Sequence, residues 1–300
     1  DDTASLSAVL GELVRGVLER AATFTSPLVP VNAFNRTQTT DDAFISLFQP
    51  TDTAHWPGNL KKYRFLNGQL VGRDGLPAVD PDTGFFLPEA VSFWSAQPDS
   101  NRVADGGAAS QIPDPVTRKV YTNLVPGSLA TSGNAFSAGN AGVTAVLLGV
   151  APADRTTLID WARGLDVNDE NQDGATTDTR HAMGDPLHAS PVSVTYGGTA
   201  SNPDFTVFVA TNDGYLHAIN PDTGAELWSF IPRRLLPRLH ELFVNGPTAV
   251  HRYGLDGQLR VFIRNSDGVP GIGGSEQVIL LFGMGRGGDA VFALDITNRS

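Results

Sequence analysis

The chain has 300 residues, 41% of them hydrophobic, with 32 glycines and 20 prolines, a composition typical of about two folded units with turn-rich β structure. Its 32 acidic residues outnumber the 21 basic ones, and the net charge of −11 argues against nucleic-acid partners and anionic membrane surfaces. The absence of cysteine excludes disulfides, thiolate zinc sites and redox dithiols.

The chain begins with a predicted amphipathic helix over residues 1–25. Apolar residues from Leu6 to Ala21 recur at three- and four-residue spacing, which places them on one face of a helix. We interpret this face as one that packs on a preceding domain, with a membrane-binding or partner-binding face as the alternative. Because no apolar run approaches the roughly 18 residues that span a bilayer, we expect no membrane insertion.

Residues 26–153 are predicted to form an irregular, β-rich region, because glycine, proline, asparagine and aspartate are frequent in it. The clearest element is a hairpin over residues 59–72, since Asn67-Gly68 is a strong two-residue turn signal. Residues 118–122 suit an edge strand, and the small, polar residues 133–140 suggest a flexible loop.

Residues 154–180 are predicted to be a short helix followed by an acidic loop. Asp154 stands at the N-cap position of the helix, and Gly164 stands where a left-handed C-cap is favoured. The helix delivers the chain directly into the loop, so the two are treated as one unit.

The acidic loop is a candidate calcium site. From Asp169 the order Asp-x-Asn-x-Asp-Gly matches the first six positions of a calcium-binding loop, in which alternate side chains point at the ion. Calcium prefers about six to eight oxygen ligands, and the loop offers carboxylates, amides and a carbonyl at close spacing. The predicted ligands are Asp169, Asn171, Asp173, Ala175 and Thr177, with Asp166, Asn168, Glu170 and Asp178 as alternates.

The match to an EF-hand ends at the twelfth position, where Arg180 replaces the bidentate glutamate. A calcium site of another type could use Asp166 or Asp178 instead, or a register through Asp166, Asn168 and Glu170. A solvated acidic linker is the alternative, because polar runs of this kind are common in loops. These residues alone leave both interpretations open, and magnesium fits less well because it retains its waters.

The region 181–300 is predicted to be the first one to two blades of a β-propeller. Its first unit is a four-stranded antiparallel sheet with strands expected at 190–196, 205–210, 215–219 and 225–230. The order Ala218-x-Asn-x-x-Thr-Gly-x-x-x-Trp228 resembles the repeat of quinoprotein-like propellers. The strand count also allows a β-sandwich, which is the alternative.

A second unit is expected to follow the first. Residues 247–253 and 257–263 are predicted to pair, and residues 277–282 to form a strand buried on both faces. Residues 289–296 repeat the Ala-x-Asn pattern as Ala-x-Asp. A propeller closes with at least about four blades, so we expect a truncated propeller that belongs to a longer protein.

The histidines and one glycine run offer weaker candidates for chemistry. His181 and His188, with Asp185 between them, lack metal-ligand spacing, and buried rings bonded to the backbone are the preferred interpretation. His217 is expected to be a cross-strand partner. Residues 283–288 have the glycines of a phosphate loop without its spacing, so a hairpin is predicted there.

Short motifs along nearly the whole chain carry a family resemblance. Four of them are Val-Asn-Ala-Phe-Asn-Arg at 31–36, Trp-Pro-Gly-Asn-Leu-Lys at 56–61, Gly-Asp-Pro-Leu-His at 184–188 and Thr-Asn-Asp-Gly at 211–214. Further motifs lie at 83–86, 106–109, 118–121, 161–164 and 287–288. Together they resemble the PilC/PilY family of type IV pilus tip-associated proteins.

The resemblance implies a non-enzymatic, secreted protein at the cell surface and pilus tip, with outer-membrane association as a further option. Such a protein primes pilus assembly with minor pilins, opposes retraction, contributes to twitching motility and adheres to host or abiotic surfaces. In that family a von Willebrand A-like domain commonly precedes this region and a seven-bladed quinoprotein-like propeller follows the acidic loop. The resemblance also favours Ca²⁺ in that loop.

Two other functions remain open alongside a pilus role. One is a dehydrogenase-like propeller that depends on pyrroloquinoline quinone, and the other is a metal-free scaffold. The dehydrogenase needs a closed propeller and, in many members, adjacent cysteines, which fewer than two blades and no cysteine do not supply.

Overall fold

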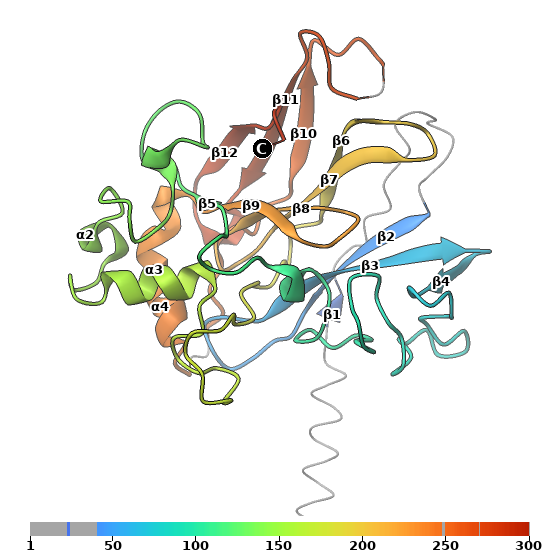
Figure 1. The fold of residues 1–300 in the computed structure, drawn as a ribbon, viewed down its shortest axis with the longest axis horizontal. Coiled ribbons are helices and arrows are strands. Elements are labelled where there is room, and N and C mark those ends of the chain that lie inside the picture. The colour runs from blue at the N-terminus through green and yellow to red at the C-terminus, as the bar shows by residue number, and fades with distance from the viewer. Residues whose placement is uncertain (1–22, 25–40, 248–249, 270, 300) are drawn as a thin grey trace, which may run out of the picture.

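A computed structural model describes residues 23–24, 41–247, 250–269 and 271–299 of the chain (Figure 1). These residues form three β-sheets and short helices, and they contain no closed barrel, so the prediction of a mainly β fold is confirmed. No helix among them is both long enough and apolar enough to cross a bilayer. The helix predicted over residues 1–25 lies outside the described residues except at its end, where residues 23–24 are a strand instead.

The first sheet has the strand order β1-β2-β3-β4 and is antiparallel throughout. Its strands are β1 (Thr23–Phe24), β2 (Asp42–Phe48), β3 (Gly58–Leu66) and β4 (Gln69–Val71). The turn predicted at Asn67-Gly68 is confirmed, because both residues have the positive φ that a two-residue type I′ turn requires, 51° and 80°.

The central sheet has the strand order β5-β9-β8-β7-β6. Four consecutive antiparallel strands confirm the predicted unit: β6 (Val192–Gly198), β7 (Pro203–Ala210), β8 (Leu216–Ile219) and β9 (Glu226–Phe230). Strand β6 begins at Val192 rather than at residue 190. Strand β5 (Val120–Tyr121) comes from far upstream and runs parallel to β9 at the edge of the sheet, as an edge strand was predicted over 118–122.

The third sheet corrects two predictions. Its strands are β10 (Arg260–Arg264), β11 (Gln277–Gly283) and β12 (Val291–Asp295). Strand β10 pairs with β11 and not with residues 247–253. Strand β11 is buried on one face only, because alternate residues point to opposite faces and Leu281, on the outer face, is 37% exposed. The glycine run at 283–288 joins β11 to β12 through the short turn η4 (Gly285–Gly287), so the predicted hairpin is confirmed.

The central sheet is buried on both faces. Val207 and Val209 of β7 share a core with Phe44 of the first sheet, whereas Phe208 shares a core with Phe282 of the third. Alternate residues of one strand therefore hold two further layers in place. Consecutive sheets stacked in this way suit neighbouring propeller blades, but closure into a propeller and the predicted domain boundaries stay predictions.

The helices lie mainly at one flank of the molecule (Figure 1). There α3 (Arg155–Arg163) contacts α4 (Leu239–Val244), with the rings of Trp161 and Phe243 5.5 Å apart. The other short helices are α2 (Ala145–Leu148), η1 (Ala108–Gln111), η2 (Ser132–Asn134) and η3 (Arg233–Arg238). The prediction of a flexible loop at 133–140 is wrong at the start of this range, because the buried Asn134 side chain bonds the backbone of Leu124 and Val125.

Candidate functional site

Helix α3 fixes the starting point of the acidic loop. As predicted, Asp154 lies at the N-cap, although its side chain makes no capping bond, and Gly164 ends the helix in the left-handed conformation with φ of 109°. Leu158, Ile159 and Trp161 bury one face of the helix in the core that holds the central and third sheets. The loop therefore leaves a rigid element.

Backbone hydrogen bonds close the loop at its base. The N–H of Asp166 donates to the carbonyl of Asp178, and the N–H of Arg180 donates to the carbonyl of Gly164, each at 2.9 Å. The two ends of the loop therefore lie side by side, and residues 166–178 form a loop whose base is closed by hydrogen bonds.

Two of the alternate calcium ligands hold this base together. Asp166 is fully buried, and its Oδ1 accepts a hydrogen bond from the N–H of Glu170 at 2.8 Å. Glu170 accepts from the Trp161 Nε1 at 2.8 Å and lies 3.8 Å from the Arg180 Nη1. Arg180 itself is buried, with its guanidinium 4.0 Å from the centre of the Trp161 ring. The arginine at the twelfth position therefore has a structural role that a glutamate ligand would not fill.

Asn171 brings two of the remaining carboxylates together. Its Nδ2 donates to Asp173 Oδ2 at 3.2 Å and to Asp178 Oδ2 at 3.1 Å. Asp178 Oδ1 is buried and has no hydrogen-bond partner among the described residues. Asp169 adopts a positive φ of 51°, and both its carboxylate oxygens accept from the N–H of Gly174, at 3.1 and 3.2 Å. Asn171 thus links the carboxylates of Asp173 and Asp178, whereas the carboxylate of Asp169 binds the backbone of Gly174.

The other predicted ligands do not join this group. Asn168 and Thr177 are exposed, and Ala175 contacts Asp173 Oδ1 through its N–H, at 2.8 Å. No set of three or more histidine or acidic side chains in the described ranges has a metal-binding arrangement. The oxygen atoms nevertheless suit a hard cation. Asp178 Oδ1 has no hydrogen-bond partner among the described residues, and Asn171, which bonds the same carboxylate, would present its amide oxygen instead of its nitrogen if the amide group rotated by 180°. Calcium binding by these residues stays a prediction.

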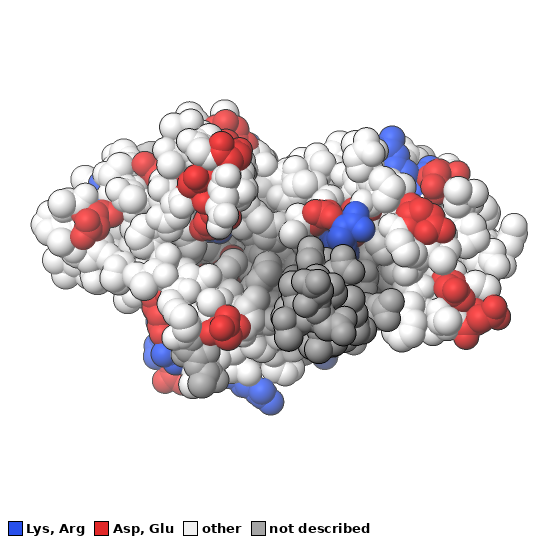
Figure 2. All heavy atoms as spheres, turned by 90° about the horizontal axis from the view of Figure 1, so that it is seen from below, with Lys and Arg blue, Asp and Glu red and all other residues white. Residues whose placement is uncertain are grey.

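The net negative charge of the protein attracts cations and repels anions. On the face seen in Figure 2, acidic side chains are spread widely and basic ones cover less of the surface, in keeping with the net charge of −11. A negative potential of this kind raises the local concentration of cations.

A second group of polar side chains, not indicated by the sequence, lies inside the central sheet. His217 Nδ1 is 2.7 Å from Glu226 Oε2, and His217 Nε2 is 3.3 Å from Thr211 Oγ1, the connectivity of a carboxylate–imidazole–hydroxyl triad. Burial opposes the charge on Glu226, but the Arg118 guanidinium and His217 outweigh it and hold the pKa of Glu226 well below its usual range. All of these side chains are buried, so no substrate reaches the hydroxyl and we interpret the group as structural. His217 is the cross-strand partner that was predicted.

The prediction that His181 and His188 bond to the backbone is confirmed for the first and wrong for the second. His181 is a ring bonded to a backbone carbonyl, at 2.8 Å, as expected. His188 instead pairs with Asp256 at 2.8 Å, because the segment before the third sheet folds back over it. Asp185 pairs with His251 at 2.8 Å, a contact between residues too far apart in sequence to be foreseen.

Comparison with known proteins gives similarity to pilus biogenesis factors. No protein-family model matches the chain, and no solved structure is significantly similar. A type IV pilus biogenesis factor PilY1 homolog of Xylella fastidiosa strain Temecula1 is 29% identical over 191 residues, which are 57% of this chain and 15% of that protein. A second homolog from this strain is 37% identical over 94 residues, 31% of this chain and 6% of that protein.

Similarity to Pseudomonas proteins covers more of the chain. The type IV pilus biogenesis factor PilY1 of Pseudomonas aeruginosa strain PAK is 26% identical over 237 residues, 69% of this chain and 19% of that protein. The chain thus spans less than a fifth of the length of each curated relative described. The similarity supports the family resemblance that the motifs indicated, since the relatives described are PilY1 type IV pilus biogenesis factors and their homologs.

Proposed function

We propose that this chain is part of a type IV pilus biogenesis factor that acts outside the cell, at the pilus tip. The observation that carries the proposal is the similarity to PilY1 proteins over as much as 69% of the chain. In this role the protein associates with minor pilins during assembly, opposes retraction, supports twitching motility and contributes to adhesion. The role is not enzymatic, and in support the triad-like group of the central sheet is closed to substrate.

Calcium bound in the acidic loop modulates this function. Asp169, Asp173 and Asp178 would supply carboxylate oxygens, and Asn171 would supply its amide oxygen after rotation. The Ala175 carbonyl and Thr177 hydroxyl complete the set if the loop tightens around the ion. The support for this arrangement is the buried Asp178 oxygen that lacks a partner among the described residues, together with the Asn171 amide that links Asp178 to Asp173.

Calcium acts here on the connection between helix α3 and the central sheet. The two ends of the loop are held by the backbone bonds of Asp166 and Arg180, and the chain runs from Arg180 directly toward β6. An ion that orders the loop therefore stiffens the path between the upstream region and the sheets. Because Asp166 and Glu170 already hold the base, the ion adds order at the tip of the loop rather than creating the fold.

Calorimetric titration of calcium into the chain tests the metal site, with thermal melts alongside. Wild type is expected to bind with micromolar affinity and to melt at a higher temperature in calcium. The Asp169→Asn/Asp173→Asn variant is expected to lose both effects, whereas the control Asp222→Asn, at an exposed turn outside the loop, keeps them. No heat and no melting shift in wild type would reduce the loop to an acidic linker on a metal-free scaffold.

A cellular assay tests the pilus role separately. The loop substitutions are placed in the full-length gene, and surface pili and twitching zones are measured at low and high calcium. Loss of pili on deletion of the gene supports the biogenesis role whatever the loop does. A calcium dependence that disappears in the loop variant supports its modulation by calcium.

A further inference from the structure

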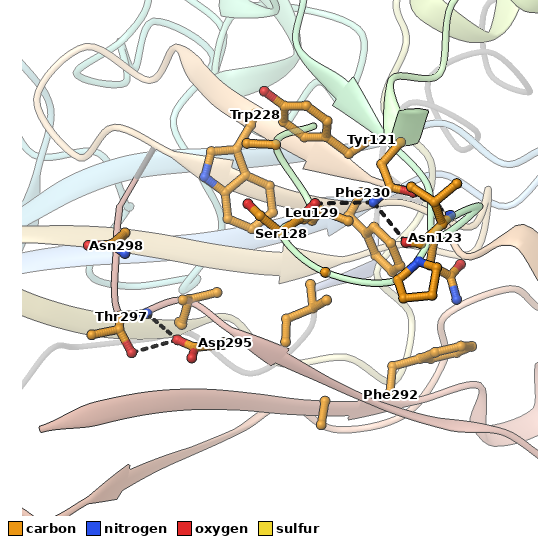
Figure 3. A pocket seen from close by; sticks show the side chains of 18 of the residues that line it. Tyr121, Asn123, Ser128, Leu129, Trp228, Phe230, Phe292, Asp295, Thr297 and Asn298 are labelled. Carbon is orange, nitrogen blue, oxygen red and sulfur yellow. Dashed lines mark hydrogen bonds between the residues drawn. The ribbon is translucent and has the colours of Figure 1, made fainter. Parts of the chain in front are cut away.

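Arginine side chains gather at the segment η3–α4, which joins the central sheet to the third. This segment buries its four leucines and turns its arginines to solvent, so that Arg233, Arg234 and Arg238 are all exposed. Its start is fixed by Asn123, which lies beside the cavity drawn in Figure 3 and accepts a hydrogen bond from the N–H of Arg233 at 2.7 Å. The arginines therefore project from an anchored element.

Two more arginines reach the same place from other parts of the chain. Arg238 donates from Nη1 to the carbonyl of Tyr253 at 2.7 Å, which places Tyr253 and the preceding Arg252 beside η3. Arg286, from the turn η4, has its guanidinium carbon 5.6 Å from the centre of the Tyr253 ring. Tyr253 thus holds arginines from two separate segments close together.

These side chains form an arginine surface with an excess of positive charge. It consists of five exposed arginines, Arg233, Arg234, Arg238, Arg252 and Arg286. Two exposed carboxylates accompany them, because Asp289 pairs with Arg234 and Glu241 pairs with Arg252. Five arginines and two carboxylates give a local net charge of +3, whereas the whole chain carries −11. Within the described ranges Arg233, Arg238 and Arg286 form no ion pair with a carboxylate.

The positive charge of this surface acts locally, although the protein as a whole is negative. At physiological ionic strength charges are screened over about 8 Å, so the local excess governs which groups bind here. Guanidinium groups match carboxylates with paired N–H donors. Because Tyr253 already orients Arg238 and Arg286, the binding of an anion to these two side chains costs less conformational entropy.

The distribution of the arginines and the apolar side chains among them indicate the kind of ligand. The arginines are spread over η3, η4 and the segment between α4 and the third sheet, which suits several anionic groups along a chain more than one small anion. Pro237 is exposed between Arg234 and Arg238, and Val244 is 62% exposed at the end of α4. A polypeptide with both acidic and apolar side chains complements this surface, whereas a uniformly charged polymer does not.

We propose that the arginine surface binds an acidic, partly apolar segment of a partner polypeptide. The carboxylates of this segment pair with Arg238 and Arg286, which have no carboxylate partner among the described residues. Its apolar side chains pack on Pro237 and Val244. Pairing of this kind supplies specificity and speeds association, and it weakens as the salt concentration rises.

Binding of a labelled peptide to the 300-residue chain tests this surface by fluorescence anisotropy, in buffer without calcium. The probe alternates glutamate with leucine, and a matched peptide has glutamine in place of glutamate. Only the acidic peptide is expected to bind saturably. The variant Arg238→Gln/Arg286→Gln is expected to bind it at least about tenfold more weakly. The control Arg260→Gln/Arg264→Gln makes the same change in net charge on β10 and is expected to stay within about twofold of wild type. Thermal melts establish that both variants are folded.

Hydrogen exchange locates the bound peptide. Residues 233–244 and 252–254 are expected to become protected, and β10 is expected to stay unchanged. The proposal is overturned if the glutamine peptide binds as well as the acidic one, if both double variants bind the acidic peptide equally, or if no saturable binding appears up to about 1 mM. It is also overturned if dextran sulfate, a sulfated polysaccharide, binds to this surface and the acidic peptide does not displace it. These results depend neither on calcium nor on the pilus role.

Discussion

The buried ion pair between Arg118 and Glu226 fastens the upstream region to the central sheet. Arg118 donates from Nε and Nη2 to the two carboxylate oxygens of Glu226, at 2.7 and 2.9 Å, and both side chains are 0% exposed. Glu226→Gln keeps the shape of the side chain but leaves the guanidinium charge without its partner inside the protein. Breaking a buried pair in this way costs about 3–5 kcal/mol of folding free energy.

Denaturant unfolding and thermal melts measure this loss. At about 2 °C per kcal/mol for a chain of this size, the melting temperature of Glu226→Gln is expected to fall by roughly 6–10 °C. Arg252→Ala is the control, because Arg252 and Glu241 form a pair that is 44% and 45% exposed and contributes only about 0–1 kcal/mol. Equal, small losses in the two variants would refute the reasoning. The double variant Arg118→Met/Glu226→Met is expected to recover much of the loss, since apolar replacements leave no unpaired charge.

Three further predictions concern pH, a glycine turn and the loop 124–128. Burial lowers the pKa of His55 and of His181 below 6.5, so the unfolded state binds protons first and stability, measured by urea unfolding, is expected to fall as the pH drops below about 6.5. Gly224→Ala is expected to lower stability by more than about 1 kcal/mol, because φ is +76° and an added Cβ would lie 2.6 Å from the Trp94 ring. Asn134→Ala, which removes side-chain bonds to the backbone of Leu124, Val125 and Ser128, is expected to cost about 1–3 kcal/mol and to increase hydrogen exchange at residues 124–128.

The elements that were predictable from the sequence are those with local signals. The β-branched and aromatic residues of 205–210 and the Asn67-Gly68 turn each determine a strand or hairpin within a few residues, and both were found. Helix α3 was likewise marked by residues at its two ends, Asp154 and Gly164. Such features depend on neighbours along the chain, which a sequence displays directly.

Long-range pairings could not be predicted in the same way. Strand β5 is two residues long and joins β9 across more than a hundred residues, and nothing in Val120 or Tyr121 specifies that partner. Strand β10 has the same pattern of apolar residues whichever neighbour it takes. In the acidic loop the spacing identified oxygen donors, but it could not show that Glu170 is held by Trp161 at the base. Ligand choice there depends on where an adjacent helix places its side chains.

The parallel pairing of β5 with β9 has a mechanical consequence. The N–H of Ser229 donates to the Lys119 carbonyl and the N–H of Ile231 donates to the Tyr121 carbonyl, both at 2.9 Å. A force that pulls the chain before β5 away from the chain after β9 acts at opposite ends of two parallel strands. It therefore stretches these bonds and the nearby buried ion pair together, in shear, instead of opening them one after another as in a peeled hairpin. The pairing of β5 with β9 therefore resists such a force and transmits tension along the polypeptide.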